Sequence, residues 1–188
     1  AECDVSIRPG WFYHPEEDGK VKSPDQLVDL YYRSVGHNAT LLLNFPVDRD
    51  GLIHPVDSAN AVLFHKIIER ELSHNLVAGM KPKVTEFAAK ALTDNSWDTY
   101  WATADGVTTA DITFSFKKPQ KINRIMLQEY IPLGQRVKKF VVEYLDGKQW
   151  KPVSQNEETT TIGYKRLLRF LTVETKGVRV RILDSRGP

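Results

Sequence analysis

Residue types that could perform acid–base chemistry are concentrated in the segment Ala1-Glu-Cys-Asp-Val-Ser-Ile-Arg-Pro-Gly-Trp-Phe-Tyr-His14. Glycoside hydrolysis needs two carboxyl groups flanking the scissile bond, one to protonate the leaving oxygen and, in retaining enzymes, one to attack carbon. The proton donor needs apolar or anionic surroundings that raise its pKa. Glu2 is a candidate for this donor, because the aromatic residues Trp11–Tyr13 could supply an apolar wall and a platform for a sugar. Arg8 could hold a ring hydroxyl or orient a carboxylate.

The residue types alone leave a second interpretation open for each of these side chains. Glu2 and Asp4 could be solvated acids, and the aromatic residues could pack in a core. His14 and the acidic run Glu16–Asp18 could suggest a metal site, but contiguous acids followed by Gly19 are more typical of a solvated loop.

Composition excludes several classes of protein. The chain has 188 residues, 41% hydrophobic and 27% charged, which is typical of one or two globular domains. A net charge of +2 is too small to argue for nucleic acid or a membrane surface as partner. Cys3 is the single cysteine, so an internal disulfide and a thiolate metal cage are excluded.

The first part of the chain has the pattern of strand, helix, strand, helix. We expect strands at residues 3–7 and 40–46, the second buried on both faces because its apolar run is continuous. Ser23 as N-cap and Pro24 at N1 predict the start of a helix that stops at Gly36. A second helix is expected over residues 55–76, with these residues on its inner side: Val56, Val62, Leu63, Ile67, Ile68 and Leu72.

This βαβα order is typical of a parallel barrel or a doubly wound sheet. Two such units cannot close a barrel, so we expect partners from elsewhere in a longer polypeptide. In a barrel, the carboxyl end of a strand faces the active site, which makes Asn44 a candidate substrate-binding residue.

After residue 80 the apolar pattern changes from a helical period to a period of two. Segment 76–82 is the expected boundary, which gives domains of residues 1–80 and 81–188. Asp146-Gly147 predicts a hairpin. Short alternating strands separated by turns favour an antiparallel β-sandwich. The strands are expected at residues 113–116, 122–127, 140–145, 168–173 and 178–182.

The segment Glu2–His14, the helix Ser23–Asn38 and the run Leu41–Ile53 resemble α-L-fucosidases of glycoside hydrolase family 29. This resemblance implies the last βα units of a (β/α)8 barrel that cleaves terminal α-L-fucose with retention. It implies that Glu2 is the general acid/base and that Arg8 and Trp11 lie close to the pocket. The nucleophile would be an aspartate on an earlier strand, outside this chain, and Asp4 has no assigned role.

The resemblance also implies partners and a compartment. The substrate would be a fucosylated oligosaccharide or glycoconjugate, the missing N-terminal part of the barrel would complete the site, and no cofactor would be needed for catalysis. The enzyme would be periplasmic or secreted. The two catalytic carboxyl groups would lie about 5 to 5.5 Å apart, and we expect the 188-residue segment alone to be inactive.

The second half resembles the galactose-binding-like sandwich, or jelly roll, of discoidin and carbohydrate-binding-module type, through the segment Ala91–Thr103. The resemblance implies that this loop could wrap a structural calcium. Alternatively, it is a hydrogen-bonded loop capped by Asp94, with Trp97 and Trp101 as core. Trp97, Tyr100 or Tyr130 could meet a sugar or serve packing. The calcium ligands would come from Asp94, Asn95, Asp98 and Thr99.

Three functions remain open from the sequence. The first is part of an exo-acting, retaining α-L-fucosidase. The second is a non-catalytic carbohydrate-binding module with a flanking α/β segment, and the third is a sandwich that only braces a barrel. The chain stops at Arg186-Gly187-Pro188, where such sandwiches continue into one more strand, so we expect truncation at both ends.

Overall fold

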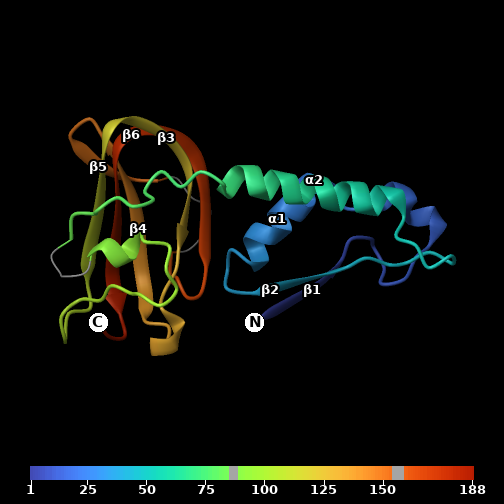
Figure 1. Ribbon diagram of the computed structural model, residues 1–188, viewed down its shortest axis with the longest axis horizontal. Coiled ribbons are helices and arrows are strands. Elements are labelled where there is room, and N and C mark those ends of the chain that lie inside the picture. The colour runs from blue at the N-terminus through green and yellow to red at the C-terminus, as the bar shows by residue number, and fades with distance from the viewer. Residues whose placement is uncertain (85–88, 154–158) are drawn as a thin grey trace. The chain divides into compact units, whose positions relative to one another are not determined.

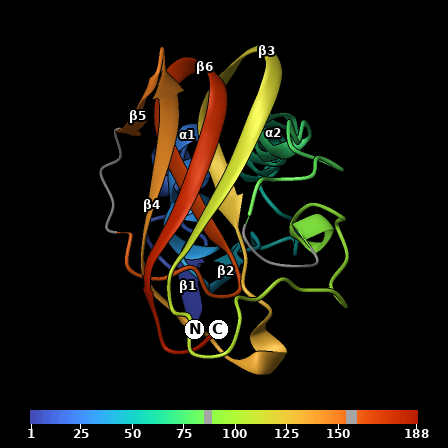
Figure 2. The same ribbon diagram turned by 90° about the vertical axis from the view of Figure 1, so that its left-hand side faces the viewer.

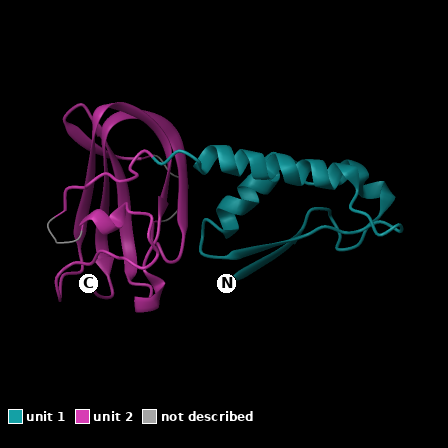
Figure 3. Cartoon of the chain, in the orientation of Figure 1, with its two compact units in different colours: residues 1–75 teal, residues 76–188 magenta. Residues whose placement is uncertain are grey.

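The computed structural model describes residues 1–84, 89–153 and 159–188. The chain forms two compact units, Ala1–Asn75 and Leu76–Pro188, which Figure 3 draws in different colours. The sequence predicts this boundary at residue 80, and the structure places it five residues earlier, between Asn75 and Leu76. Within the described ranges, no helix has the length and apolar character needed to cross a membrane.

The first unit is built on two parallel strands, β1 (Glu2–Ser6) and β2 (Thr40–Asn44), as Figure 1 shows. The register pairs Glu2 with Thr40 and Ser6 with Asn44. Two helices, α1 (Pro24–Ser34) and α2 (Pro55–Leu72), pack on one side of the strands, and a short 3₁₀ helix η1 (Pro15–Lys20) follows β1. The predicted strand, helix, strand, helix order is therefore present in this unit.

The start of α1 is set by local chemistry that the sequence predicted. The Ser23 Oγ accepts a hydrogen bond from the Gln26 amide, and the Gln26 side chain accepts one from the Ser23 amide, which forms a reciprocal capping box. Pro24 follows at a position that needs no amide hydrogen. The helix then buries Leu27, Val28 and Tyr32.

Two expectations for the first unit are not met within this chain alone. Strand β2 is not buried on both faces, because Leu42 is 45% exposed. Helix α2 ends at Leu72, four residues early, and its exposed side chains include Val56, Val62 and Leu63, which were expected on the inner face. Apolar residues occur on both sides of α2, so periodicity could not decide which side this unit covers.

The second unit is an antiparallel sheet in the order β3-β6-β4-β5. Its strands are β3 (Ala110–Leu127), β4 (Val137–Asp146), β5 (Gln149–Pro152) and β6 (Arg166–Ser185), with 3₁₀ helices η2 (Ala89–Leu92) and η3 (Ile131–Leu133) in the loops. The predicted hairpin at Asp146-Gly147 is confirmed between β4 and β5, with Gly147 at φ +61°.

One prediction for the second unit is wrong, because four of the expected short strands form only two long strands. The segments 113–116 and 122–127 form one long strand, β3, and the segments 168–173 and 178–182 form one long strand, β6. Both strands curl over at one end of the sheet (Figures 1 and 2), where the register shifts between Ser115 and Gln120. A bulge of this kind bends a strand without ending its pairing.

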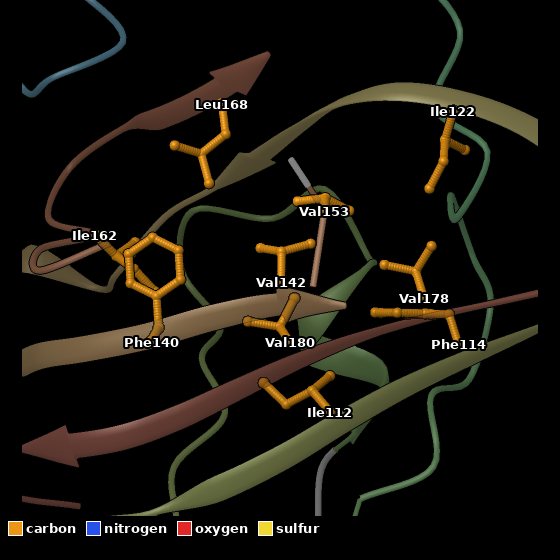
Figure 4. Close-up of a cluster of buried hydrophobic side chains, with 10 residues drawn as sticks. All are labelled: Ile112, Phe114, Ile122, Phe140, Val142, Val153, Ile162, Leu168, Val178 and Val180. Carbon is orange, nitrogen blue, oxygen red and sulfur yellow. The ribbon is translucent and has the colours of Figure 1, made fainter. Parts of the chain in front are cut away.

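The curl closes the sheet over its own core. The first half of β3 pairs with the second half of β6, and the second half of β3 pairs with the first half of β6. Across the interior, Leu168 faces the β4 side chains and Ile122 faces Val178 of β6 (Figure 4). Phe140 and Val142 are fully buried at the centre. The other members of this cluster are Ile112, Phe114, Val153, Ile162, Val178 and Val180.

Phe140→Ala should lower the free energy of unfolding of the second unit by about 3–5 kcal/mol, because it leaves a cavity at the centre of this cluster. Amide hydrogen exchange in β4 and β6 measures this loss. Leu171→Ala is the matched control, because Leu171 is 77% exposed. Equal losses in the two variants would contradict the assigned core.

Candidate functional site

The predicted acids lie on one exposed face of the two-stranded sheet. Glu2 and Asp4 alternate with Cys3 and Val5 along β1, and both acids are exposed to solvent. Their register partners on β2 are Thr40 and Leu42. The face opposite the helices therefore presents two carboxylates beside a half-exposed leucine, a surface that leaves both acids accessible to a reacting group.

At the carboxyl end of the same strands, Asn44 holds the loop that follows β1. Its amide nitrogen Nδ2 donates to the Ser6 Oγ and to the Trp11 carbonyl oxygen, both at 3.1 Å. The Ile7 amide also donates to the Asn44 carbonyl, at 3.0 Å. Asn44 thus lies at the predicted strand end, where its side-chain amide fixes the path of the chain toward Trp11.

Arg8 is fully buried, and its guanidinium forms a bidentate ion pair with Asp57 of α2. The Nε–Oδ2 and Nη2–Oδ1 distances are 2.8 and 2.9 Å. A third contact joins Nη1 to the Asp18 carboxylate at 2.9 Å, and the guanidinium lies 4.6 Å from the Tyr13 ring centroid. The hydrogen bond to Asp57 raises the pKa of Arg8 above its ordinary value.

This geometry makes Arg8 a positioning residue. Its donors are engaged by Asp57, by Asp18 and by the His14 carbonyl, and none of its side chain is exposed. The substrate contact predicted for Arg8 therefore has no accessible surface in this unit. What Arg8 does instead is tie the loop of residues 9–18 to the first turn of α2.

Sequence reasoning missed Asp57 and misread Asp18. Asp57 is completely buried although it stands in the first turn of a helix, where acids are usually solvated. The available signal was its helical spacing with Phe64 and Ile68 on the inner side of α2. The acidic run predicts a solvated loop for Asp18, but its side chain is only 35% exposed and its Oδ2 lies 3.5 Å from the His54 Nε2.

The structure does not bring all the predicted site residues together. Glu2 and Ser6 are the first and last residues of β1, about 13 Å apart at a rise of about 3.3 Å per residue. The cluster of Arg8, Asn44 and the Trp11 carbonyl is at the Ser6 end. Trp11 itself is 53% exposed, so its ring is accessible to a ligand.

In the second unit, Asp94 holds together the loop Ala91–Thr103, for which the sequence predicts a possible calcium site. Its Oδ1 accepts from the Ser96 amide at 3.0 Å and its Oδ2 accepts from the Thr99 hydroxyl at 2.7 Å, and these bonds lower its pKa. Asn95 adopts a left-handed conformation, and the Asp98 amide donates to the Ser96 hydroxyl. Among the described residues, no group of three or more His, Cys, Asp or Glu side chains could hold a metal ion. Both Asp94 oxygens therefore have internal donors, and calcium binding at this loop stays a prediction.

The same loop displays two aromatic pairs. Trp97 stacks on Tyr164, with ring centroids 5.7 Å apart and planes 17° apart, and Tyr100 stacks on Tyr130 at 4.8 Å and 16°. The expectation that Trp97 belongs to the core is wrong, because it is 62% exposed. Trp101 does pack against the core.

The segments that carry Tyr130 and Tyr164 are fixed by one carboxylate. Glu129 accepts through Oε1 from the amides of Arg136 and Val137, and through Oε2 from the amide of Gly163. Its own amide donates to the Gly163 carbonyl. Charge-assisted bonds of this kind are stronger than neutral ones, so the backbone beneath the two tyrosines is held in place.

Comparison with known proteins identifies the second unit. The model of the F5/8 type C domain matches residues 81–188, which is more than half of the chain. Over these residues the chain belongs to the F5/8 type C domain family. The antiparallel sheet described above, which curls over its own core, fits the β-sandwich of this domain.

The whole chain, including the residues before the F5/8 type C domain, is similar to α-L-fucosidases. It is 38% identical over its full length to a rice (Oryza sativa subsp. japonica) protein named "Putative alpha-L-fucosidase 1" and covers 37% of that protein. A "putative alpha-L-fucosidase" structure from Bacteroides thetaiotaomicron matches all of the chain with a TM-score of 0.94 and 44% identity, over 42% of its own length.

A family 29 fucosidase from Ruminococcus gnavus, solved in complex with fucose, matches all of the chain with a TM-score of 0.87 and 32% identity, over 39% of its length. The resemblance to family 29 α-L-fucosidases is therefore confirmed. The chain spans about two fifths of the length of these relatives.

Asp57→Asn should lower the free energy of unfolding of the first unit by about 3–5 kcal/mol, because it leaves the buried Arg8 charge without its counter-ion. Urea denaturation followed by the far-ultraviolet helical signal, which comes from α1 and α2, measures this loss. Asp25→Asn, an exposed acid in the first turn of α1, is the control. A loss no larger than in this control would contradict the role given to the ion pair.

Proposed function

We propose that this chain is part of a retaining, exo-acting α-L-fucosidase and supplies its general acid/base. The observation that carries the proposal is the similarity of the full chain, residues 1–75 included, to fucosidases. The motif around Glu2 that resembles family 29 lies within this similarity. An F5/8 type C domain alone would leave the first 80 residues unexplained.

The first unit supports a place in a larger parallel barrel. Its two strands have free outer edges within the described residues, and apolar side chains are exposed on the open face of the sheet and on α2. Leu42 is one of them, and on α2 Val56, Val62 and Leu63 are others. Further strands and helices of the same enzyme would cover these side chains.

In the proposed reaction, Glu2 donates its proton to the glycosidic oxygen as the aglycone leaves. An aspartate elsewhere in the enzyme attacks the anomeric carbon and forms a glycosyl-enzyme intermediate. Glu2, now ionised, removes a proton from water, and this water releases fucose with retained configuration.

The loop after β1 supplies positioning in this proposal. The Arg8–Asp57 pair and Asn44 hold the backbone from Pro9 to Trp11, and Trp11 offers an exposed ring to the apolar face of a sugar. A ring held by a rigid backbone costs little entropy when ligand binds. Arg8 therefore contributes to substrate binding through Trp11 and makes no contact with the sugar itself.

Glu2→Gln in the full-length enzyme should lower kcat/KM on a fucoside with a poor leaving group by about 10²–10⁴-fold, the typical contribution of general acid catalysis. The loss should be much smaller on an activated aryl fucoside, whose leaving group needs no protonation. Added azide should restore turnover of the activated substrate, because it can attack the glycosyl-enzyme without a general base.

Asp4→Asn is the matched control for this experiment. Asp4 lies on the same exposed face, two residues further along β1, and should retain activity within a few-fold. The 188-residue chain alone serves as the blank and should show no turnover. Equal losses of Glu2→Gln on both fucosides, or an equal loss in Asp4→Asn, would rule out Glu2 as the acid.

A second candidate function is sugar binding by the F5/8 type C domain, which the exposed stacked rings favour. Trp97 and Tyr164 stack on each other, and both are more than half exposed. A pyranose presents a patch of C–H groups that can stack on such a face. This function would add to the hydrolase activity and would not replace it.

Trp97→Ala should weaken binding of a fucosylated oligosaccharide to the 188-residue chain by roughly fivefold to tenfold, the value of one stacking contact. Isothermal titration calorimetry measures the affinity. Tyr164→Phe keeps the ring and is the matched control, so it should bind as the unchanged chain does. Unchanged affinity in Trp97→Ala would assign the aromatic pairs to packing.

A further inference from the structure

The charge of the chain is divided unevenly between its two units. Residues 1–75 contain 7 Lys and Arg against 12 Asp and Glu, which gives a net charge of −5. Residues 76–188 contain 19 against 12, which gives +7, and the two values combine to the total of +2. The second unit is therefore strongly basic although the net charge of the whole chain is small. A positive charge of this size attracts anionic partners.

Part of this charge gathers at the curled end of the sheet. Lys117 and Lys118 lie in the bulge of β3 between Ser115 and Gln120, and the register of these two residues places the bulge across from Lys176 of β6. The β4–β5 turn, which carries Lys148, lies at the same end (Figures 1 and 2). We call Lys117, Lys118, Lys148 and Lys176 the lysine tip.

A buried hydroxyl holds the turn beside the bend. The Thr175 Oγ1 accepts from the Leu145 amide at 3.1 Å and lies 2.8 Å from the Leu145 carbonyl oxygen. Thr175 is the neighbour of Lys176 on β6, and Leu145 is three residues before Lys148 on the turn. The bulge of β3, the facing segment of β6 and the β4–β5 turn therefore bring lysines from three separate segments to one end of the sheet.

The lysine tip is not neutralised by its surroundings. All four side chains are exposed, and none of them forms an ion pair with another described residue. The nearby Asp146 pairs with Lys151, and Glu174 stands opposite Lys121 in the register. Four like charges gathered without counter-ions repel one another, and a polyanion would relieve that repulsion.

We propose that the lysine tip binds an acidic glycan, a polysaccharide chain that carries sulfate or carboxylate groups. Lysine ammonium groups act as flexible point charges, which suits anionic groups repeated along a chain. A bilayer is a poorer fit, because membrane binding at an interface also needs apolar side chains to insert. Of the described residues, the exposed large hydrophobic ones lie outside segments 115–121, 145–149 and 174–177.

This site would be separate from the stacked aromatic rings. It would hold the protein on acidic glycans through charge, whichever neutral sugar the other sites recognise. The proposal does not depend on the hydrolase activity, because it concerns the charge of the second unit alone. Its affinity should fall steeply with ionic strength, since binding releases counterions from the polyanion.

The test measures binding of the 188-residue chain to two probes, heparin for sulfate groups and polygalacturonate for carboxylates. With four charges engaged and a slope of about 0.7 per charge, a rise from about 50 to 200 mM salt should weaken binding roughly 50-fold. The variant Lys117→Gln/Lys118→Gln/Lys148→Gln/Lys176→Gln should lose at least about tenfold at the lower salt concentration. The stronger probe identifies the anionic group preferred.

The matched control removes four other exposed lysines of the same unit, in the variant Lys81→Gln/Lys83→Gln/Lys90→Gln/Lys139→Gln. It changes the net charge equally and should retain most of the binding. Equal weakening in the two variants, or no binding of the unchanged chain to either probe at low salt, would overturn the proposal. So would equal or tighter binding to phosphatidylserine vesicles or to single-stranded DNA.

Discussion

The Arg8 guanidinium is completely removed from solvent and must find its counter-charges inside the first unit. It finds them 49 residues away in the first turn of α2, where Asp57 is equally buried. A buried charge without a partner is far more costly than the pair. The loop after β1 and the start of α2 therefore cannot separate without exposing or orphaning both charges.

Several features of the first unit follow from that constraint. The chain between Arg8 and Asp18 is closed into a compact loop, because the same guanidinium also binds the Asp18 carboxylate and the His14 carbonyl. Tyr13 lies over the guanidinium, whereas Trp11 and Phe12 point to solvent. The ion pair thus determines which aromatic ring serves packing and which ring is available to a ligand.

In the second unit, charged groups also fix loops, but here carboxylates accept hydrogen bonds from backbone amides. Its central cluster is apolar, and the curl of β3 and β6 closes this core without a second separate sheet. Glu129 and Asp94 fix the loops at its surface by accepting amide and hydroxyl donors. Rigid loops can present exposed rings, and the rigid curled end can present exposed lysines. Each unit therefore combines a fixed polar scaffold with accessible side chains.

Local signals in the sequence predicted the elements well where the cause was itself local. The capping box at Ser23, the hairpin at Asp146-Gly147 and the order of elements in the first unit depend on neighbours within a few residues. The change of apolar period near residue 80 likewise separated the two units, and the motif around Glu2 indicated the family. These features could be predicted because short-range sterics and hydrogen bonding decide them.

Contacts between distant residues decided the rest. Nothing near Arg8 in the sequence indicates that it pairs with Asp57, nothing near Trp97 that it stacks on Tyr164, and nothing near Lys117 that Lys148 and Lys176 join it. The sequence by itself determined the helices, the turns, the alternation of the strands and the family resemblance. Only the tertiary structure decided which charges are buried, which rings are exposed and which lysines meet, because burial and proximity arise when segments far apart in the chain pack together.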